Sequence, residues 1–345
     1  MAINNINFNT HTKKFRWVFL SLIVGGSLIL ILPTVFIFQI KHGQEKQSQE
    51  AVAQFPVTVD PQNKIIVESE AVNEYLASPD SPLQASVFDT RETFTSIYKW
   101  FVTMVANTSM YQNLALAGGG RLITITPGLR KEQVANSFGK ALAWNNEDKK
   151  DFTTAKEGAS LPLTEGSFFP EVYFVELGTT PEIAQDLVNK RFAEEVLSHY
   201  GESVSNVVPL NTALTIASLI ERETIGTDDM RMISGIIWNR IFKGMNLQID
   251  ATLQYVKASN KTTTVWWPKV LSKDKYLKSP YNTYINSGLP PTPIANPSVA
   301  SILAALNPTQ TTCLFYFHDK RGGFHCTDTY SEHVKQLKKY YGQGK

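Results

Sequence analysis

The sequence is poor in cysteine, in histidine and in charge of either sign. Only two of its 345 residues are cysteines, too few for a disulfide-stapled scaffold or a cysteine-rich zinc site. Its six histidines are scattered, so neither a metal site nor a cofactor is expected. The 33 basic residues nearly balance the 31 acidic ones, and a net charge of +2 argues against a nucleic-acid-binding protein. The length, with 43% apolar residues, is sufficient for two domains that each bury a core.

Common catalytic signatures are also missing. The sequence contains no H-E-x-x-H, no P-loop and no G-x-S-x-G motif. Two S-x-x-K matches begin at Ser96 and Ser272, but neither S-D-N nor K-T-G accompanies them. A pattern with two free positions arises easily by chance, so a penicillin-binding-protein type of active site is not expected.

One long hydrophobic run is present, at 17–40, and it contains no charged residue. As a helix it would extend about 36 Å, enough to cross a hydrocarbon core of about 30 Å. The basic residues Lys13, Lys14 and Arg16 precede it and place the N-terminus in the cytoplasm by the positive-inside rule. The alternative is a cleaved signal peptide, but its apolar region should be shorter and should lie closer to the small residues at 51–53.

These segments predict a single-pass membrane protein. Residues 1–16 form a cytoplasmic stub, 17–40 the transmembrane helix and 41–54 a polar linker, and all that follows is extracytoplasmic. Anchor and signal peptide lead to the same compartment for the remainder of the chain.

The external part reads as an α+β protein. Two short β-like runs lie within 55–70, and helical spacing occupies 90–106. An alternating strand at 122–126 ends at a Pro-Gly turn, and apolar residues at helical spacing follow it through Leu142. Further helices are expected at 181–197, from an N-cap at Asn211 through Glu223, and at 228–243.

The helix that ends near residue 223 carries two glutamates, Glu221 and Glu223. Two positions correspond to about 200° of rotation, so the two carboxylates cannot share a face. Glu221 lies on the apolar stripe that includes Leu214 and Ala217, and is predicted to point inward. Desolvation and the negative end of the helix dipole would both raise its pKa, as a general acid requires. The alternative is a surface ion pair with Arg222 or Arg240.

Four segments occur in order and resemble motifs of the YceG-like (MltG) family of membrane-anchored endolytic murein transglycosylases. They are ASLIERET, the Asn-Arg pair at 239–240, GMNLQIDAT at 244–252 and SPYNTYINSGLPPTPIANP at 279–297. Upstream, LTEGSFFPEVY at 163–173 is similar to another family stretch, and ITITPGLRKEQVANSF at 123–138 resembles its LysM-like module. The resemblance implies a divergent region at 55–160 with a LysM-like module at about 120–155, and a YceG-like catalytic domain at 161–345.

The resemblance further implies cleavage of the β-1,4 bond between N-acetylmuramic acid and N-acetylglucosamine, with formation of a 1,6-anhydro ring. The family's catalytic glutamate falls on Glu221, which would act as both general acid and general base. The implied partners are peptidoglycan glycan strands, the cytoplasmic membrane and cell-wall synthesis complexes such as those of penicillin-binding proteins. The implied location is the bacterial inner membrane, with the catalytic domain in the periplasm. Predicted substrate-binding residues are Asn239, Arg240, Gln248, Asp250, Tyr281, Asn282 and Tyr284.

Two other functions remain open at this point. One is a hydrolytic muramidase with Glu223 or Asp250 as a second carboxylate. The other is a non-enzymatic, membrane-anchored glycan-binding or scaffold protein of cell-wall synthesis. The latter is suggested by a departure from the family pattern, since Phe324 stands where the family often has a histidine and leaves His325 displaced by one position.

The two cysteines and two tryptophans leave further alternatives. A hairpin of 312–317 and 324–329 would place Cys313 opposite Cys326 if its loop is symmetric, whereas one residue of asymmetry would destroy that alignment. An oxidising compartment permits a disulfide there. Trp266 and Trp267 are either a platform for sugars or part of the core.

Overall fold

The computed structural model describes residues 53–78, 81, 120–154, 164–260 and 265–342. The predicted stub, the transmembrane helix, most of the linker and the predicted helix at 90–106 lie outside the described residues. Among the helices that are described, none is long and apolar enough to cross a membrane. The mixture of helices with small antiparallel sheets confirms the predicted α+β class.

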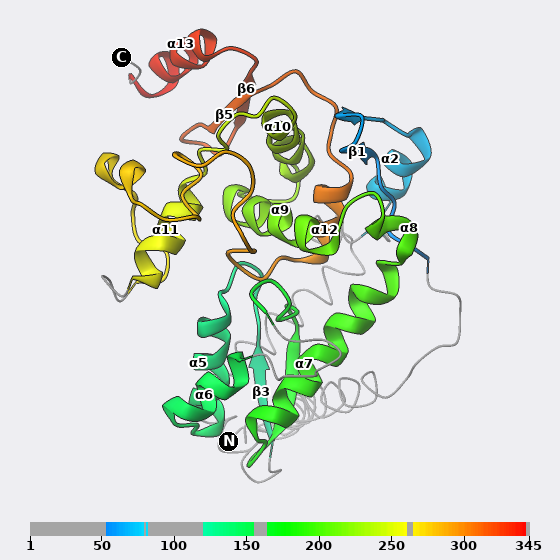
Figure 1. The fold of residues 1–345 in the computed structure, drawn as a ribbon, viewed down its shortest axis with the longest axis vertical. Coiled ribbons are helices and arrows are strands. Elements are labelled where there is room, and N and C mark those ends of the chain that lie inside the picture. The colour runs from blue at the N-terminus through cyan, green and yellow to red at the C-terminus, as the bar shows by residue number, and fades with distance from the viewer. Residues whose placement is uncertain (1–52, 79–80, 82–119, 155–163, 261–264, 343–345) are drawn as a thin grey trace, which may run out of the picture.

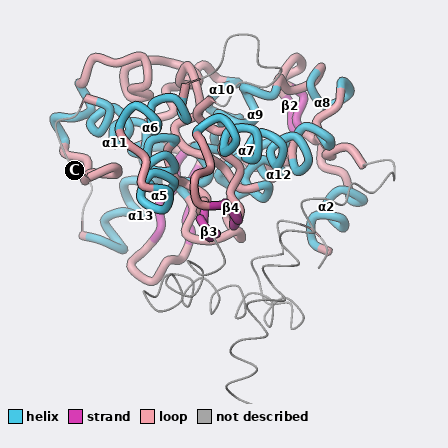
Figure 2. Tube along the Cα trace, turned by 90° about the horizontal axis from the view of Figure 1, so that it is seen from below, coloured by secondary structure: helices cyan, strands magenta, loops and turns pink. Residues whose placement is uncertain are grey.

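A βααβ unit forms the lower half of the molecule in Figure 1. Strand β3 (Gly120–Thr124) pairs antiparallel with β4 (Val172–Glu176), and between them in the chain lie α5 (Lys131–Leu142) and α6 (Asn146–Thr153). Figure 2 shows the two strands side by side. Helix α7 (Pro181–Glu195) packs against α6.

This unit has a core of its own and extends past its predicted boundary. The core contains large buried side chains from both strands and all three helices, namely Ile123, Val134, Phe138, Phe152, Phe168, Tyr173, Val175 and Val188. Because β4 supplies half of the sheet, the unit extends past residue 155, where the LysM-like module was expected to end, and past 161, where the catalytic domain was expected to start.

The upper half is built around helix α9 (Leu210–Glu223). It packs against α12 (Val299–Leu306), α10 (Met230–Phe242) and α11 (Asp250–Ser259). All residues from Ala213 to Ile220 are buried, so the helix is enclosed on every side rather than on one stripe. The helix begins at Leu210 with Pro209 as its N-cap residue, so the predicted cap at Asn211 is wrong.

Smaller elements surround this helical centre. At the N-terminal side, β1 (Val59–Asp60) and β2 (Ile65–Ile66) form a short antiparallel pair, as the β-like runs predicted. Helix α2 (Glu70–Ala77) follows them. Short helical turns occupy η1 (Leu197–His199), α8 (Glu202–Ser205) and η2 (Ser272–Tyr276). At the C-terminal side, β5 (Phe315–His318) and β6 (Phe324–Thr327) form a hairpin that α13 (Tyr330–Tyr341) covers.

The two halves meet at a buried asparagine, Asn296. Its Oδ1 accepts hydrogen bonds from the N–H groups of Gly166 (3.0 Å) and Phe168 (2.9 Å), and its Nδ2 donates to the carbonyl of Leu129 (2.8 Å). The backbone of Asn296 also bonds to Gly128 and Leu129. One side chain of the upper half thus organises two loops of the βααβ unit.

Candidate functional site

A groove of about 950 Å³ lies between the C-terminal end of α9, the start of α11 and the C-terminal hairpin. We call it the Glu223 groove. Its lining combines one partly buried acid with amides, aromatic rings and a few charges: Glu223, Arg240, Met245, Asn246, Gln248, Asp250, Lys275, Tyr284, Phe315, Tyr316, Phe317, His318, Tyr330, His333 and Leu337. Such a mixture of ring faces and planar hydrogen-bonding groups suits a carbohydrate, which offers apolar ring faces and many hydroxyls.

Glu223 is the last residue of α9 and faces this groove. Its Oε2 accepts a hydrogen bond of 2.7 Å from the hydroxyl of Tyr316. Loss of water around the carboxyl raises the pKa of Glu223 to about 7, and the negative charge of Asp250 adds to this. The hydrogen bonds from Tyr316 and from the backbone N–H of Ala251, together with His318, act in the opposite direction. Glu223 is therefore a carboxyl that carries a proton up to neutral pH.

Tyr316 and His318 alternate with Phe315 and Phe317 along β5, so Tyr316 and His318 share one face of the strand. Each of them bonds to an acid at the edge of the α9–α10 connection: Tyr316 to Glu223, and His318 through Nε2 to Asp229. Burial and the charge of Glu223 hold the pKa of Tyr316 well above its ordinary value, so this hydroxyl remains a donor. The hairpin thereby fixes the position of the Glu223 carboxyl.

Glu221, the predicted catalytic residue, lies outside the groove. Its Oε2 accepts three hydrogen bonds, from the N–H and hydroxyl of Ser298 (3.0 and 2.7 Å) and from the hydroxyl of Ser301 (2.6 Å). Ser298 is the N-cap residue of α12, so Glu221 stabilises the positive end of that helix. This geometry does not support Glu221 as the catalytic acid. The two carboxylates do point to different sides, as predicted, but it is Glu223 that reaches the groove.

Four of the predicted substrate-binding residues line the groove: Arg240, Gln248, Asp250 and Tyr284. Asp250 is the first residue of α11 and accepts a hydrogen bond of 2.6 Å from the hydroxyl of Tyr284. Arg240 is buried, and donates from Nε to the carbonyl of Leu314 (2.7 Å) and from a terminal nitrogen to that of Leu247. It therefore holds two wall segments together.

The other three predicted substrate-binding residues support loops. Asn239 donates to the carbonyls of Thr311 (2.7 Å) and Cys313 (3.2 Å). Asn282 is fully buried and donates to the carbonyls of Lys275 and Leu277. Tyr281 packs on Tyr255 and shares a hydrogen bond with Thr292. Hydrogen bonds and packing within the protein therefore account for these three residues, and none of the three lines the groove.

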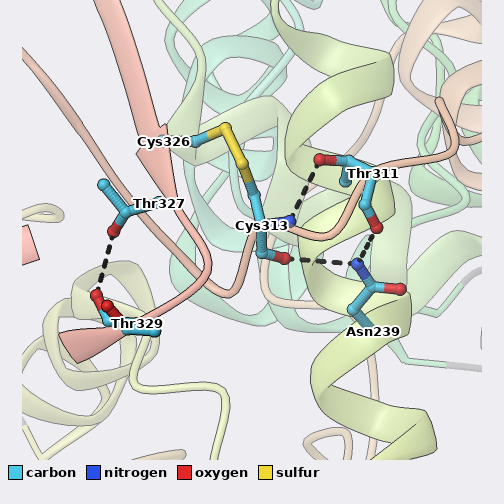
Figure 3. Close-up of a disulfide and its surroundings, with 6 residues drawn as sticks. All are labelled: Asn239, Thr311, Cys313, Cys326, Thr327 and Thr329. Atoms are coloured by element: carbon cyan, nitrogen blue, oxygen red, sulfur yellow. Dashed lines mark hydrogen bonds between the residues drawn. A yellow bond between two sulfur atoms is a disulfide. The ribbon is translucent and has the colours of Figure 1, made fainter. Parts of the chain in front are cut away.

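The cysteines form a disulfide, Cys313–Cys326, with 5.8 Å between the Cα atoms. The hairpin register pairs Cys326 with Tyr316, so the predicted symmetric pairing is wrong although the bond itself is present. Figure 3 shows how this arises: Cys313 lies before β5, in a segment whose carbonyls at Thr311 and Cys313 are held by Asn239. The disulfide links this segment to β6, and thereby holds β5, which follows the segment and lines the groove.

The C-terminal histidines and the tryptophan pair each have defined neighbours in the structure. His333 lines the groove, whereas His325 bonds to Asp319 in the hairpin turn. Each tryptophan of the 266–267 pair lies under a guanidinium, with Arg130 5.5 Å from the Trp266 ring and Arg222 4.0 Å from the Trp267 ring. No group of three or more histidine, cysteine or acidic side chains comes together as a metal site within the described parts of the chain.

Another acid with a raised pKa, Glu165, is buried away from this groove. Burial raises the pKa of Glu165 to about 8, but this carboxylate accepts hydrogen bonds from the N–H of Lys131 (2.8 Å) and the hydroxyl of Tyr255 (3.3 Å). It lies between the two halves of the molecule and is not among the residues that line the Glu223 groove.

Sequence reasoning missed the hairpin side of the groove. Phe315, Tyr316, His318 and Tyr330 all line it, and none of them was predicted as a site residue. They lie about 90 to 110 residues after Glu223 in the chain, and only the pairing of β5 with β6 and the packing of α13 bring them to the acid. The aromatic run at 315–317 was the one available signal.

Comparison with known proteins identifies several relatives of this chain. A sequence model described as the YceG-like family matches residues 62–339. An endolytic murein transglycosylase of Bacillus subtilis (strain 168) is 33% identical over 239 residues, which is 63% of this chain and 64% of that protein. One of Streptococcus pneumoniae serotype 2 is 30% identical over 168 residues, 49% of this chain and 30% of that protein. The match thus spans less than two thirds of either relative.

A solved structure also resembles this chain. The crystal structure of a YceG-like protein from Listeria monocytogenes superposes with a TM-score of 0.52 at 27% sequence identity. The superposition covers 62% of this chain and 75% of the Listeria chain.

Proposed function

The chain belongs to the YceG-like family, and on that premise we propose that it is an endolytic murein transglycosylase with Glu223 as its catalytic acid and base. The names of the two relatives support the reaction. The observation that carries the residue assignment is the position of Glu223, a carboxyl with a pKa of about 7 in a groove lined by amides and aromatic rings. A carboxyl still protonated near neutral pH is what general-acid cleavage of a glycosidic bond needs.

The reaction uses one carboxyl twice. Glu223 donates its proton to the oxygen that links N-acetylmuramic acid to N-acetylglucosamine, and the bond from C1 of the muramic acid to that oxygen breaks. The resulting Glu223 carboxylate then takes the proton of the C6 hydroxyl of the same sugar, whose oxygen closes on C1 as a 1,6-anhydro ring. Glu223 ends protonated, no water is consumed, and Tyr316 stabilises the intermediate carboxylate by its hydrogen bond.

The test is the chemical identity of the product. The full chain incubated with purified glycan strands is expected to release fragments that end in 1,6-anhydro-N-acetylmuramic acid, detected by mass spectrometry. Such fragments are lighter by one water than hydrolytic products. Reducing ends would instead identify a muramidase, with Asp250 as the second carboxylate. Binding to intact murein without any soluble product would identify a glycan-binding or scaffold protein.

The activity should fall as the pH rises through about 7. The protonated form of Glu223 is the active one, and its fraction drops about tenfold per pH unit above the pKa. Tyr316→Phe removes a hydrogen bond that favours the ionised carboxylate, so the pKa of Glu223 and the limb of the pH profile should move upward. The measurement is kcat/KM for product release between pH 5 and 9. A limb that stays in place, or moves downward, would contradict the role of Tyr316.

The N-terminal run and the βααβ unit complete the proposal. Residues 17–40 anchor the chain in the cytoplasmic membrane and leave the groove outside the cytoplasm, where an oxidising compartment permits the Cys313–Cys326 disulfide. The βααβ order of β3, α5, α6 and β4 supports a LysM-like module beside the catalytic half.

A further inference from the structure

Three aromatic rings gather at the end of the Glu223 groove that α13 forms. Tyr330, Phe315 and His333 are in mutual contact, with ring centroids 5.7 Å apart for Phe315–Tyr330, 5.6 Å for Phe315–His333 and 6.4 Å for Tyr330–His333. The guanidinium of Arg240 lies 5.4 Å from the Phe315 ring. Phe315 and His333 thus support the ring of Tyr330 from the protein side.

Tyr330 is left open to the solvent in this arrangement. Its side chain lines the groove and yet 62% of the residue is exposed, a large value for an aromatic residue that is packed against two others. Burial and the nearby Arg240 lower the pKa of His333, so the cluster is uncharged at neutral pH. An exposed, supported and neutral ring face in a groove is a surface for an apolar ligand face.

The cluster and the acid contact different residues of β5. Tyr316 bonds to Glu223, whereas Phe315, its neighbour in the strand, contacts Tyr330. Because neighbouring side chains of a strand project to opposite faces, a sugar stacked on Tyr330 would occupy another position along the glycan strand than the sugar whose bond Glu223 cleaves.

We propose that Tyr330, supported by Phe315 and His333, is an outlying subsite that stacks on a hexopyranose ring of the glycan strand. The inference rests on the proposed function for its ligand, a β-1,4-linked strand of N-acetylated sugars. The C–H groups on one face of such a ring match the apolar face of the tyrosine, and stacking of this kind requires the ring rather than the hydroxyl. The subsite favours strands long enough to reach from Glu223 to α13, which is the behaviour of an enzyme that cuts within a strand.

The test measures binding without turnover. In a Glu223→Gln background of the full chain, calorimetry gives the Kd for a hexamer and a trimer of β-1,4-linked N-acetylglucosamine. Tyr330→Ala is expected to weaken binding of the hexamer about tenfold and to change binding of the trimer much less. Tyr330→Phe keeps the ring and should stay within about twofold of the background. Tyr75→Ala, which removes an exposed tyrosine on α2 outside the groove, is the matched control.

Three other outcomes would overturn the subsite or its ligand. An unchanged hexamer affinity in Tyr330→Ala overturns the subsite, as does an equal loss in Tyr330→Phe and Tyr330→Ala. A background protein that binds neither oligomer overturns the glycan as its ligand. Failure of the proposed function is seen separately, as an absence of 1,6-anhydro product from the native chain, whatever the effect of Tyr330 on the affinity.

Discussion

Glu223→Gln is expected to lower the rate of release of 1,6-anhydro product about a thousandfold without unfolding the protein. The amide keeps the size of the side chain and can still accept the hydrogen bond of Tyr316, but it cannot donate a proton to the glycosidic oxygen. General acid–base catalysis contributes about 10² to 10⁴ in rate, and in the proposed mechanism a single group performs both steps. The measurement is product release by mass spectrometry, with circular dichroism and the thermal unfolding midpoint as checks of the fold.

Glu221→Gln is the matched control, because it makes the same change two residues away. Its cost should appear in stability, since an amide oxygen accepts more weakly than a carboxylate from Ser298 and Ser301. We expect a lower unfolding midpoint and a rate within about fivefold of the native protein at a temperature where both are folded. The reverse pattern, an inactive Glu221→Gln and an active Glu223→Gln, would return the catalytic role to Glu221.

Local patterns predicted much of the fold. Helical spacing and end signals anticipated α7, α9 and α10, with each end within two residues of its observed position. Alternation anticipated β3, and two segments that flank a turn anticipated the C-terminal hairpin. The extent of the βααβ unit was missed because β4 pairs with a strand about fifty residues earlier in the chain. No local pattern reports such a pairing.

The choice between the two glutamates shows where sequence reasoning reaches its limit. The argument for Glu221 assumed that the apolar stripe of α9 faces the groove. In the structure this helix is buried on all sides, so a side chain that points away from solvent can meet any of several neighbouring elements. On the Glu221 side the neighbour is the start of α12, while the groove opens beside Glu223. Only the tertiary packing shows that the Glu221 carboxylate caps a helix and that the Glu223 carboxyl faces the groove.

Polar motif residues were over-assigned to the groove for a related reason. Asn239 and Asn282 each satisfy two backbone carbonyls of irregular segments. Loops without a regular hydrogen-bond ladder need such side chains when they are buried. The sequence marks these residues as special, but it does not distinguish support of a wall from contact with a ligand.

Asn296→Ala should lower the free energy of unfolding by about 3 to 5 kcal/mol, because each buried group left unpaired costs about 1 to 3 kcal/mol. Asn296 is fully buried, and its Oδ1 satisfies the N–H groups of Gly166 and Phe168, which lose this acceptor in the variant. Leu129 also loses a donor to its carbonyl. The measurement is urea unfolding followed by tryptophan fluorescence.

Asn286→Ala provides the comparison, since this asparagine belongs to the same motif and its side chain donates two hydrogen bonds, to the carbonyls of Ser279 and Asn282, against two accepted and one donated by Asn296. Asn286 is exposed, so water can replace both bonds and the loss should stay within about 1 kcal/mol. The difference between the two variants measures burial rather than the number of bonds. An equally small loss of stability in both variants would contradict this prediction. It would mean that the loops at 128–129 and 166–168 are held by their own backbone contacts, and that the two halves of the molecule do not depend on the Asn296 side chain.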